Sequence, residues 1–443
     1  MFSSVQAVTT LYSLLRHPGM EREQIVAFQN ARVRRLIHHA YKHVNYYRHL
    51  FDRHGIRPEQ IRTIEDLARI PITSRTDLQA LPDTDIVMRQ VNPASLIPSR
   101  SSGSSGRPLT VRRSWIEERL HNAFRWRALR SYGLRATDVH AYVVMARVPR
   151  GEDNRILHSL AQTIGLGRFV VVGCFQSPGD ILRELRKIRP NAVSGYASAV
   201  TGMAHHVDPI DLRSLQLRFV GTGGEVLTPR MRETIEEAFG APVYDSYASI
   251  EFNILAWQCG QSKALHACDD GVVMEIMEGA RAVSEGEEGE VVGTDLHSYA
   301  MPLIRYRLGD IVIRGRSPCP CGQPFSTIQT IRGRTIDYFN LPDGRVMHPY
   351  ELGMTNYPWI SEFKIIQERL DRIVLRIVPR AGEVAQVALL KRSVATRVGP
   401  DVDVEVEVVA TIPVEPSGKF SPFRSLLRER ESDVHEDNGR RKG

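Results

Sequence analysis

The sequence predicts a layered α/β fold with a large N-terminal domain and a small α+β C-terminal domain. Short apolar segments alternate with helical segments over residues 115–251, an order typical of parallel strands joined by helices. Residues 363–411 show a different order, in which two adjacent strands precede a helix and a further strand. With 443 residues, the chain is also too long for a single hydrophobic core. We therefore expect at least two folded domains.

The N-terminal elements follow from apolar spacing. Residues 5–54 are predicted to be helical because apolar side chains recur at roughly three- and four-residue intervals. A short helix near 64–69 precedes a turn at Pro71. The same reasoning predicts further helices at 115–132, 156–164, 181–188 and 229–239. It predicts strands at 109–111, 140–145, 169–172 and 192–194, a strand that runs into a glycine-rich turn at 217–225, a strand end near 243–246, and strands at 289–293 and 301–312.

The C-terminal part has its own pattern. It predicts a hairpin at 363–367 and 372–378, a helix at 384–398 and a strand at 402–411. We place the N-terminal domain at 1–332 and the C-terminal domain at 333–427, with a connector at 331–337. The highly charged tail at 428–443 is expected to be disordered.

Composition narrows the function classes. The chain is 42% hydrophobic and 25% charged, with a formal net charge of +7 spread along most of its length. Without a basic cluster interleaved with aromatic residues, this charge does not indicate nucleic-acid binding. No apolar run is long enough to cross a bilayer, and the N-terminus lacks a secretory signal pattern. We expect a cytoplasmic protein that does not insert into membranes.

A serine- and glycine-rich stretch precedes the strand at 109–111. Its glycines allow the backbone N–H groups to converge on an anion, its hydroxyls can donate to phosphate oxygens, and its arginine adds positive charge. A flexible linker has the same composition, so this stretch alone leaves both interpretations open. The candidate phosphate-binding residues are Ser101, Ser102, Gly103, Ser104, Ser105, Gly106 and Arg107, followed by Pro108.

Three further candidates are each weak alone. The Gly223-Gly224-Glu225 turn follows a strand, and ligands of α/β sheets collect at the carboxyl ends of strands. Tyr247 and Glu251 combine an aromatic side chain with a carboxylate that could bind Mg²⁺ on phosphates. Glu251 could equally be a surface residue at the start of a helix. Asp310 follows a glycine at an expected strand end, where it could accept hydrogen bonds from ribose hydroxyls.

Together the motifs resemble those of the adenylate-forming enzymes. The nearest branch is the phenylacetate-coenzyme A ligase family, including relatives associated with capsular polysaccharide synthesis. Two segments are typical of that branch: the Pro-Ile-Thr-Ser stretch at 71–74 and the Cys-Pro-Cys-Gly stretch at 319–322. The resemblance spans about 41–419, and its ordered motifs are Ser101 to Pro108, Tyr247 with Glu251, Pro302 to Asp310, Gly333-Arg334 and Pro416 to Lys419.

The resemblance implies that ATP binds between a large N-terminal domain and a small mobile C-terminal domain. It implies a phosphate-binding role for the Ser101 to Arg107 loop and Mg²⁺ binding by Glu251. Lys419 would bridge the substrate carboxylate and the α-phosphate, a role that suits a compact ammonium on a flexible stem. The same resemblance assigns the adenine to Gly223, Gly224, Glu225, Asp245, Ser246 and Tyr247, and the ribose to Asp310 and Arg334.

The cysteines and one histidine suggest a metal site. Cys259, His266, Cys319 and Cys321 are four ligands of the types that tetrahedral Zn²⁺ prefers, and Cys268 is a competing ligand. The odd number of cysteines, five, fits metal ligation or unpaired core thiols better than disulfides. Structural zinc is our prediction, since the resemblance also implies a metal at this place.

Three departures from the family pattern concern activity. Ile250 replaces a hydroxyl residue beside Glu251, Ile336 replaces the usual hinge aspartate, and residues 341–346 lack the usual Arg-Gly loop. The resemblance implies activation of a small-molecule carboxylic acid as acyl-adenylate and transfer to a thiol acceptor, coenzyme A. One alternative is transfer to an amine or hydroxyl acceptor in polysaccharide or secondary-metabolite synthesis. Another is a degenerate nucleotide-binding regulatory protein. The oligomeric state stays open, a homodimer being one option.

Overall fold

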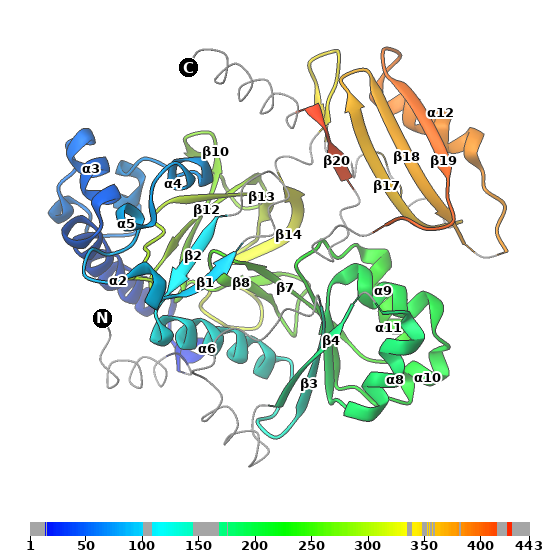
Figure 1. Ribbon diagram of the computed structural model, residues 1–443, viewed down its shortest axis with the longest axis horizontal. Coiled ribbons are helices and arrows are strands. Elements are labelled where there is room, and N and C mark those ends of the chain that lie inside the picture. The colour runs from blue at the N-terminus through cyan, green and yellow to red at the C-terminus, as the bar shows by residue number, and fades with distance from the viewer. Residues whose placement is uncertain are drawn as a thin grey trace. The chain divides into compact units, whose positions relative to one another are not determined.

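The computed structural model describes residues 14, 16–100, 109–144, 168–174, 176–334, 339–347, 352, 354, 357, 359–380, 382–413 and 423–427. The chain divides into two compact units, Met1–Arg332 and Gly333–Gly443 (Figure 1). Each unit has its own hydrophobic core.

The first unit begins with helices. The helix predicted over 5–54 is in fact a short 3-10 turn followed by two helices, α2 (Arg22–His43) and α3 (Asn45–His54), and residues 5–13 lie outside the described residues. Val44 between the helices is extended and buried, which turns the chain so that Tyr47 and Phe51 of α3 share a core with α2. Burial of these apolar side chains favours the break over one continuous helix.

Short elements then lead to a hairpin. They are the 3-10 helices η2 (Pro58–Gln60), η3 (Glu65–Arg69) and η4 (Pro93–Ser95), with the short helices α4 (Arg75–Gln79) and α5 (Asp83–Ile86). The 3-10 helix η1 (His17–Gly19) is the turn that precedes α2. Strands β1 (Ile97–Arg100) and β2 (Thr110–Arg113) pair antiparallel, with Arg100 opposite Thr110. This pairing brings together the two ends of the serine- and glycine-rich stretch at 101–108, which itself lies outside the described residues.

One twelve-stranded mixed sheet organises this unit, in the order β11-β10-β12-β13-β14-β9-β8-β7-β6-β5-β3-β4. The predicted parallel strands form one half: β3 (Val139–Val144), β4 (Arg168–Gly173), β5 (Ala192–Gly195), β6 (Phe219–Gly223) and β7 (Val243–Ser249). The sheet continues through β8 (Asn253–Gln258), β9 (Leu265–Ala267), β10 (Val272–Glu278), β11 (Arg281–Ala282), β12 (Glu288–Asp295), β13 (Tyr306–Arg314) and β14 (Thr327–Arg334).

Helices cover both faces of the parallel half. On one face lies the group visible in green in Figure 1, whose apolar side chains share a core with the strands: α8 (Pro178–Ile188), α9 (Ala197–His206), α10 (Pro209–Arg213) and α11 (Pro229–Phe239). On the other face, α6 (Trp115–Ser131) packs through Phe124 and Ala128. These helices confirm the predicted alternation, while the helix predicted at 156–164 lies outside the described residues.

Two predictions near β13 are wrong. The strand expected at 301–312 begins only at Tyr306, because Arg305 has a φ of 46° and turns the chain just before it. Asp310 was expected at a strand end but lies inside β13, within a bulge at 308–310 where Gly309 has a φ of 78°. A bulge with a left-handed glycine redirects the next side chain, so it places Asp310 as effectively as a strand end would.

The second unit is a small α+β domain. Its four-stranded sheet has the order β19-β18-β17-β20, and the hairpin of β17 (Ile360–Arg369) with β18 (Arg372–Pro379) is the predicted one. Apolar side chains of α12 (Val387–Val398) and of this sheet form its core. The other elements are β15 (Phe339–Asn340), β16 (Val346–Met347), β19 (Asp403–Val408) and β20 (Phe423–Ser425). In the described part of the chain, no helix is both long and apolar enough to cross a membrane.

Candidate active site

The candidate site lies where the parallel half of the sheet meets the antiparallel half. Strands β5, β6 and β7 run parallel, whereas β8 returns antiparallel to β7. The glycine-rich turn after β6 and the 246–251 segment at the end of β7 therefore lie side by side at the carboxyl ends of these strands. This is the place where open α/β sheets bind their ligands.

Gly223 and Gly224 are both required by geometry. A Cβ atom at Gly223 would lie 2.7 Å from the Ser246 Oγ on the neighbouring strand. Gly224 has a φ of 76°, in the left-handed region that favours glycine. Ser246 donates through its hydroxyl to the Thr222 carbonyl oxygen at 2.9 Å, which fixes the two strand ends together. The turn thus brings its backbone close to any ligand that binds at the carboxyl ends of these strands.

Glu225 caps a helix. Its carboxylate accepts hydrogen bonds from the Ser198 backbone N–H at 2.8 Å and from the Ser198 hydroxyl at 3.0 Å. Ser198 lies in the first turn of α9, where unsatisfied N–H groups and the helix dipole favour a negative charge. Glu225 therefore links the β6 turn to the start of α9.

Asp245 is a buried carboxyl group on β7. It accepts a hydrogen bond from the Thr222 hydroxyl at 2.8 Å. Burial raises the pKa of Asp245 to about 6, with the Thr222 hydrogen bond opposing the shift. Its side chain is held against β6, so its direct contacts are within the sheet.

Tyr247 joins β7 to the bulge of β13. Its hydroxyl donates to the Asp310 carboxylate at 2.6 Å, a short hydrogen bond to a charged acceptor. Tyr247 is buried, whereas Asp310 is half-buried. The sequence separates these residues widely, and the sheet brings together the two side chains that the resemblance assigns to adenine and ribose.

Glu251 lies in the turn between β7 and β8, buried and close to a cation. The expected alternative, a surface Glu at a helix start, is wrong because this segment is a β-hairpin. Its carboxylate lies 3.4 Å from the Arg75 guanidinium and 3.5 Å from the Tyr306 hydroxyl. Burial, and then the Glu251 charge, raise the pKa of Tyr306, so this hydroxyl stays protonated. Both contacts are long, so the carboxylate is only weakly paired by them.

Arg75 is a site residue that our sequence reasoning did not single out. It follows the 71–74 segment, in which Thr73 pairs with the chain at β13: its N–H donates to the Arg305 oxygen and its oxygen accepts from the Arg307 N–H, both at 2.9 Å. Ser74 then caps α4 by accepting from the Asp77 N–H. Only the folded sheet shows that Arg75 reaches Glu251.

The backbone around Ile250 is held by another arginine. Arg113 donates through one guanidinium nitrogen to the Ile250 oxygen at 3.0 Å and to the Glu251 oxygen at 2.5 Å. Arg113 is itself buried and comes from β2, the strand that follows the serine- and glycine-rich stretch. The turn is thus fixed through backbone contacts that do not depend on a hydroxyl at position 250.

Several predicted site residues cannot be placed. Arg334 is the last residue of β14, and only its backbone is described. Ile336 also lies outside the described residues. The same holds for the phosphate-binding candidates and the proposed catalytic lysine: Ser101, Ser102, Gly103, Ser104, Ser105, Gly106, Arg107 and Lys419.

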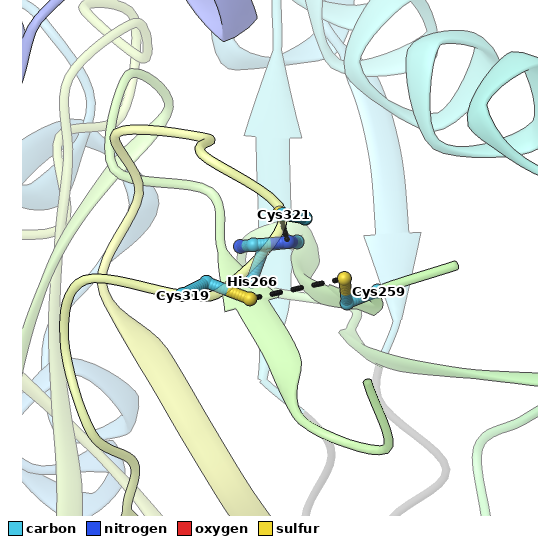
Figure 2. Close-up of side chains that lie close together, drawn as sticks. All are labelled: Cys259, His266, Cys319 and Cys321. Atoms are coloured by element: carbon cyan, nitrogen blue, oxygen red, sulfur yellow. Dashed lines mark hydrogen bonds between the residues drawn. The ribbon is translucent and has the colours of Figure 1, made fainter. Parts of the chain in front are cut away.

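The four predicted metal ligands converge in space (Figure 2). Their donor atoms all lie within 4.8 Å of one another. The Cys259 and Cys319 sulfurs are 3.8 Å apart, and the Cys321 sulfur is 3.2 Å from His266 Nε2. Cys259 follows β8, His266 lies on β9, and the other two come from the loop between β13 and β14. Pairing of His266 with Thr327 of β14 brings that loop to the histidine.

Cys268 belongs to a different cluster. It is fully buried and contacts Arg127 Nη2 at 3.6 Å and Asp270 at 3.7 Å. It is not among the grouped ligands. Among the described residues, the structure therefore groups Cys259, His266, Cys319 and Cys321 and leaves Cys268 apart from them.

Comparisons with known proteins agree with this architecture. Residues 345–424 match the family model described as the CapK C-terminal domain. The phenylacetate-coenzyme A ligase of Thermus thermophilus is 26% identical over 343 residues, covering 73% of this chain and 74% of that protein. Protein CapK of Staphylococcus aureus is 22% identical over 422 residues, covering 90% of this chain and 89% of that protein.

A solved structure shows the same fold. The crystal structure of 2-hydroxyisobutyryl-CoA ligase in the postadenylation state, in complex with R3-HIB-AMP, aligns with a TM-score of 0.76 at 22% identity. The alignment covers 95% of this chain and 94% of that one. The anthranilate CoA ligase AuaEII in complex with anthranoyl-AMP aligns with a TM-score of 0.55 at 14% identity, covering 78% and 69%. The resemblance drawn from the motifs is confirmed: this chain is similar to the phenylacetate-coenzyme A ligases and to CapK, and it has the fold of the solved CoA ligases.

Proposed function

We propose that this chain is an ATP-dependent acid-thiol ligase, which activates a carboxylic acid as acyl-adenylate and transfers the acyl group to coenzyme A. The observation that carries the proposal is the convergence of Tyr247, Asp310, Glu251 and Arg75 at the carboxyl ends of the strands. Several solved relatives of this fold are described as CoA ligases with acyl-adenylates bound. We propose that the reaction takes place in the cytoplasm, where ATP and coenzyme A are both available.

In the first half-reaction, a carboxylate oxygen of the acid attacks the α-phosphorus of ATP. A new P–O bond forms, the bond to the β-phosphate breaks, and pyrophosphate leaves with its electron pair. Such a step needs positioning and charge stabilisation more than covalent help. In our proposal the Tyr247–Asp310 pair holds the ribose, and the 101–107 stretch holds the phosphates. Lys419 of the C-terminal unit contacts the carboxylate and the α-phosphate.

Glu251, through a bound Mg²⁺ ion, and Arg75 would stabilise the negative charge of the ATP phosphates. A buried carboxylate with only long contacts suits a Mg²⁺ ion that is bound by one protein carboxylate and the phosphates. When bound there, Mg²⁺ would neutralise charge on the phosphates. Arg75 adds a second, fixed positive charge at the same place, and its guanidinium can donate directly to phosphate oxygens. A hydroxyl at position 250 is therefore not the sole means of contacting the phosphates.

The test is pyrophosphate release from ATP and Mg²⁺ across a panel of aryl, fatty and hydroxy acids. We expect acid-dependent release that falls by at least about 100-fold in Lys419→Ala, as for loss of a transition-state contact. Lys391→Ala is the matched control, since Lys391 is an exposed lysine of α12 in the same unit. Measurable ATP binding without release for any acid would contradict the proposal and favour a regulatory nucleotide-binding protein.

The acceptor needs a separate measurement. The departures at Ile336 and at 341–346 concern the hinge and the transfer step, so transfer to an amine or hydroxyl remains the second candidate function. Single-turnover assays on preformed acyl-adenylate would compare coenzyme A with amine and hydroxyl acceptors. We expect consumption of the adenylate to require coenzyme A. Consumption by an amine without coenzyme A would replace our first candidate with the second.

We further propose that Cys259, His266, Cys319 and Cys321 hold a structural Zn²⁺ ion. Tetrahedral zinc with Zn–S bonds of about 2.3 Å places two sulfurs about 3.8 Å apart. The Cys259–Cys319 separation of 3.8 Å fits this value, whereas it is far too long for a disulfide. With four protein ligands the ion would have no open position for substrate, so its chemistry would be to tie the loop between β13 and β14 to β8 and β9.

Metal content measured by mass spectrometry tests the zinc proposal. We expect about one zinc per chain in the wild type. Cys319→Ser should lose the metal, whereas Cys268→Ser should keep it because Cys268 lies in the Arg127–Asp270 cluster. A wild-type protein purified without chelators that contains no metal, or equal metal loss in both variants, would contradict the assignment.

A further inference from the structure

A positive charge of the protein lies beside the carboxylate that we assign to Mg²⁺. The Arg75 Nη2 lies 3.4 Å from Glu251 Oε1, and the Tyr306 hydroxyl lies 3.5 Å from the same oxygen. In the described part of the chain, Arg75 is the sole ion-pair partner of Glu251, and no hydrogen bond reaches its Oε2. The Glu251 side chain is 7% exposed and that of Arg75 is 22% exposed. One oxygen of a buried carboxylate thus faces a guanidinium of the protein itself.

The backbone beside Arg75 is held in place. Thr73 forms a parallel bridge with β13 at Tyr306, through two backbone hydrogen bonds of 2.9 Å. Ser74 then caps α4, of which Arg75 is the first residue. Rotation of the long Arg75 side chain therefore moves its charge toward or away from Glu251 while the backbone stays where it is.

A divalent cation that approaches Glu251 meets the charge of Arg75. Water screens this repulsion only weakly, because the carboxylate is buried. Without nucleotide, one carboxylate attracts the cation while a guanidinium repels it. The phosphates of ATP change this balance, since their oxygens accept hydrogen bonds from a guanidinium and bind Mg²⁺ together with a protein carboxylate. Two positive charges that repel each other without nucleotide are both neutralised once the phosphates are present.

We propose that Arg75 makes metal binding at Glu251 conditional on the nucleotide, so that the site rejects a divalent cation alone and accepts it together with ATP. The inference rests on the proposed function and specifies how its metal site is controlled. Before the nucleotide binds, the Arg75 charge opposes the metal, and afterwards the guanidinium contacts the phosphates. Arg75 is therefore a positioning residue that sets when the metal binds, and metal and nucleotide enter the site as one complex.

The second guanidinium at this turn has a different role. Arg113 is buried and donates to the backbone oxygens of Ile250 and Glu251. Its Nη1 lies 3.7 Å from the Glu118 carboxylate, so its charge has an acidic partner other than Glu251. Removal of Arg113 would disturb the hairpin itself. Removal of the Arg75 side chain leaves these backbone contacts in place, so it isolates the effect of the charge.

Titration with Mn²⁺, followed by electron paramagnetic resonance, tests the proposal without catalysis. We expect Arg75→Ala to bind Mn²⁺ alone at least about 10-fold more tightly than the wild type does, because a repelling charge is removed. Arg75→Lys keeps the charge and should stay close to the wild type. Loss of a merely structural contact would weaken metal binding or leave it unchanged. With a non-hydrolysable ATP analogue present, the wild type should bind Mn²⁺ far more tightly than without it.

Arg218→Ala is the matched control. Arg218 lies 3.1 Å from Asp138, whose side chain is 6% exposed, and it precedes β6 at the end of the strand opposite to the candidate site. This variant also removes an arginine from beside a buried carboxylate, and its affinity for Mn²⁺ should equal that of the wild type. Adding Glu251→Gln to Arg75→Ala should abolish the tight binding. Thermal unfolding confirms that each variant folds.

Three results would overturn the assignment: an affinity for Mn²⁺ alone that does not rise in Arg75→Ala, an equal rise in Arg218→Ala, or tight binding that survives Glu251→Gln. ATP–pyrophosphate exchange measured on the same proteins keeps the proposed function separate. Exchange by the wild type, with no rise in Mn²⁺ affinity in Arg75→Ala, would remove only the control by Arg75. Tighter Mn²⁺ binding in Arg75→Ala, with no exchange by the wild type for any acid, would remove the ligase activity and leave that control in place.

Discussion

Removing the Asp270 charge should destabilise the first unit strongly. Asp270 is fully buried and accepts from Arg127 Nη2 at 2.8 Å, while His17 Nδ1 lies 2.7 Å from its other oxygen. The Arg127 guanidinium also stacks on Trp257 and Phe325, with centroid distances of 4.8 and 5.0 Å. Asp270→Asn would leave this guanidinium buried and without its counter-charge, which costs about 3–5 kcal/mol. For a unit of this size we expect the melting temperature to fall by about 5–10 °C.

The matched control is an exposed ion pair. Asp211 and Arg186 are 2.6 Å apart, with side chains 45% and 47% exposed. Asp211→Asn should therefore cost at most about 1 kcal/mol. Urea unfolding of both variants beside the wild type is the assay. If the two substitutions lower the midpoint equally, burial does not set the strength of the Asp270 contacts, and the reasoning fails.

The same carboxylate predicts a pH dependence. Burial by itself would raise the pKa of Asp270, but Arg127 and His17 outweigh it and hold the pKa below its usual value. A carboxyl group with a depressed pKa stabilises the fold above the pKa of the unfolded chain, about 4, and loses that contribution as the pH falls toward its folded value. The difference in the free energy of unfolding between wild type and Asp270→Asn should therefore be largest at neutral pH and decrease below about pH 4. A difference that grows on acidification would contradict the assigned sign.

Three further predictions concern the active site and the metal cluster. Tyr247→Phe removes the hydrogen bond to the Asp310 carboxylate and should raise the KM for ATP about 10-fold, measured by pyrophosphate release. An unchanged KM would separate Asp310 from nucleotide binding. Arg75→Ala should lower kcat/KM at least about 10-fold and Arg75→Lys less, since lysine keeps the charge. An equal loss of kcat/KM in Arg75→Ala and Arg75→Lys would show that the positive charge at this position is irrelevant. Chelator treatment should lower the melting temperature of the wild type but not of Cys319→Ser, and an equal shift in both would show that the chelator acts elsewhere.

Periodicity predicted the parallel half of the sheet well because its strands β4, β5 and β6 are each followed by a helix. The strand at 192–194 and the helix at 229–239 appear in the structure as β5 and α11 with little change at their ends. The antiparallel half was predicted less completely. Its strands pair over long sequence distances, and pairing partners leave no local signal. The twelve-stranded order could therefore not be read from the chain.

The break in the N-terminal helix has a similar origin. Residues on both sides of Val44 keep helical spacing, so local pattern alone gives no reason to end α2 there. The break becomes favourable only when Tyr47 reaches the chain at Pro302 and Ile304. The Tyr47 hydroxyl donates to the Pro302 oxygen at 3.1 Å and accepts from the Ile304 N–H at 2.9 Å. Tertiary contacts thus override a local preference.

The metal cluster was predicted from ligand types, whereas Arg75 could not be. Cysteine is rare in this chain, with five residues, so a pattern of three cysteines and a histidine carries information. Arginine is abundant, and no feature of the sequence distinguishes Arg75 from its neighbours. Its role depends on the pairing of Thr73 with β13, which is a contact across more than two hundred residues. The sequence therefore indicates the chemistry of a rare residue more readily than that of a common one.

The departure at Ile250 does not by itself indicate a degenerate site. Glu251 is buried, and among the described residues its carboxylate has long contacts, to Arg75 and Tyr306. A weakly paired buried charge of this kind costs stability, and an apolar residue of similar size is often more stabilising. The hairpin does not need the Glu251 side chain, since Arg113 holds its backbone oxygens. The proposed role of Glu251, binding a cation on the phosphates, would account for a carboxylate at this buried position.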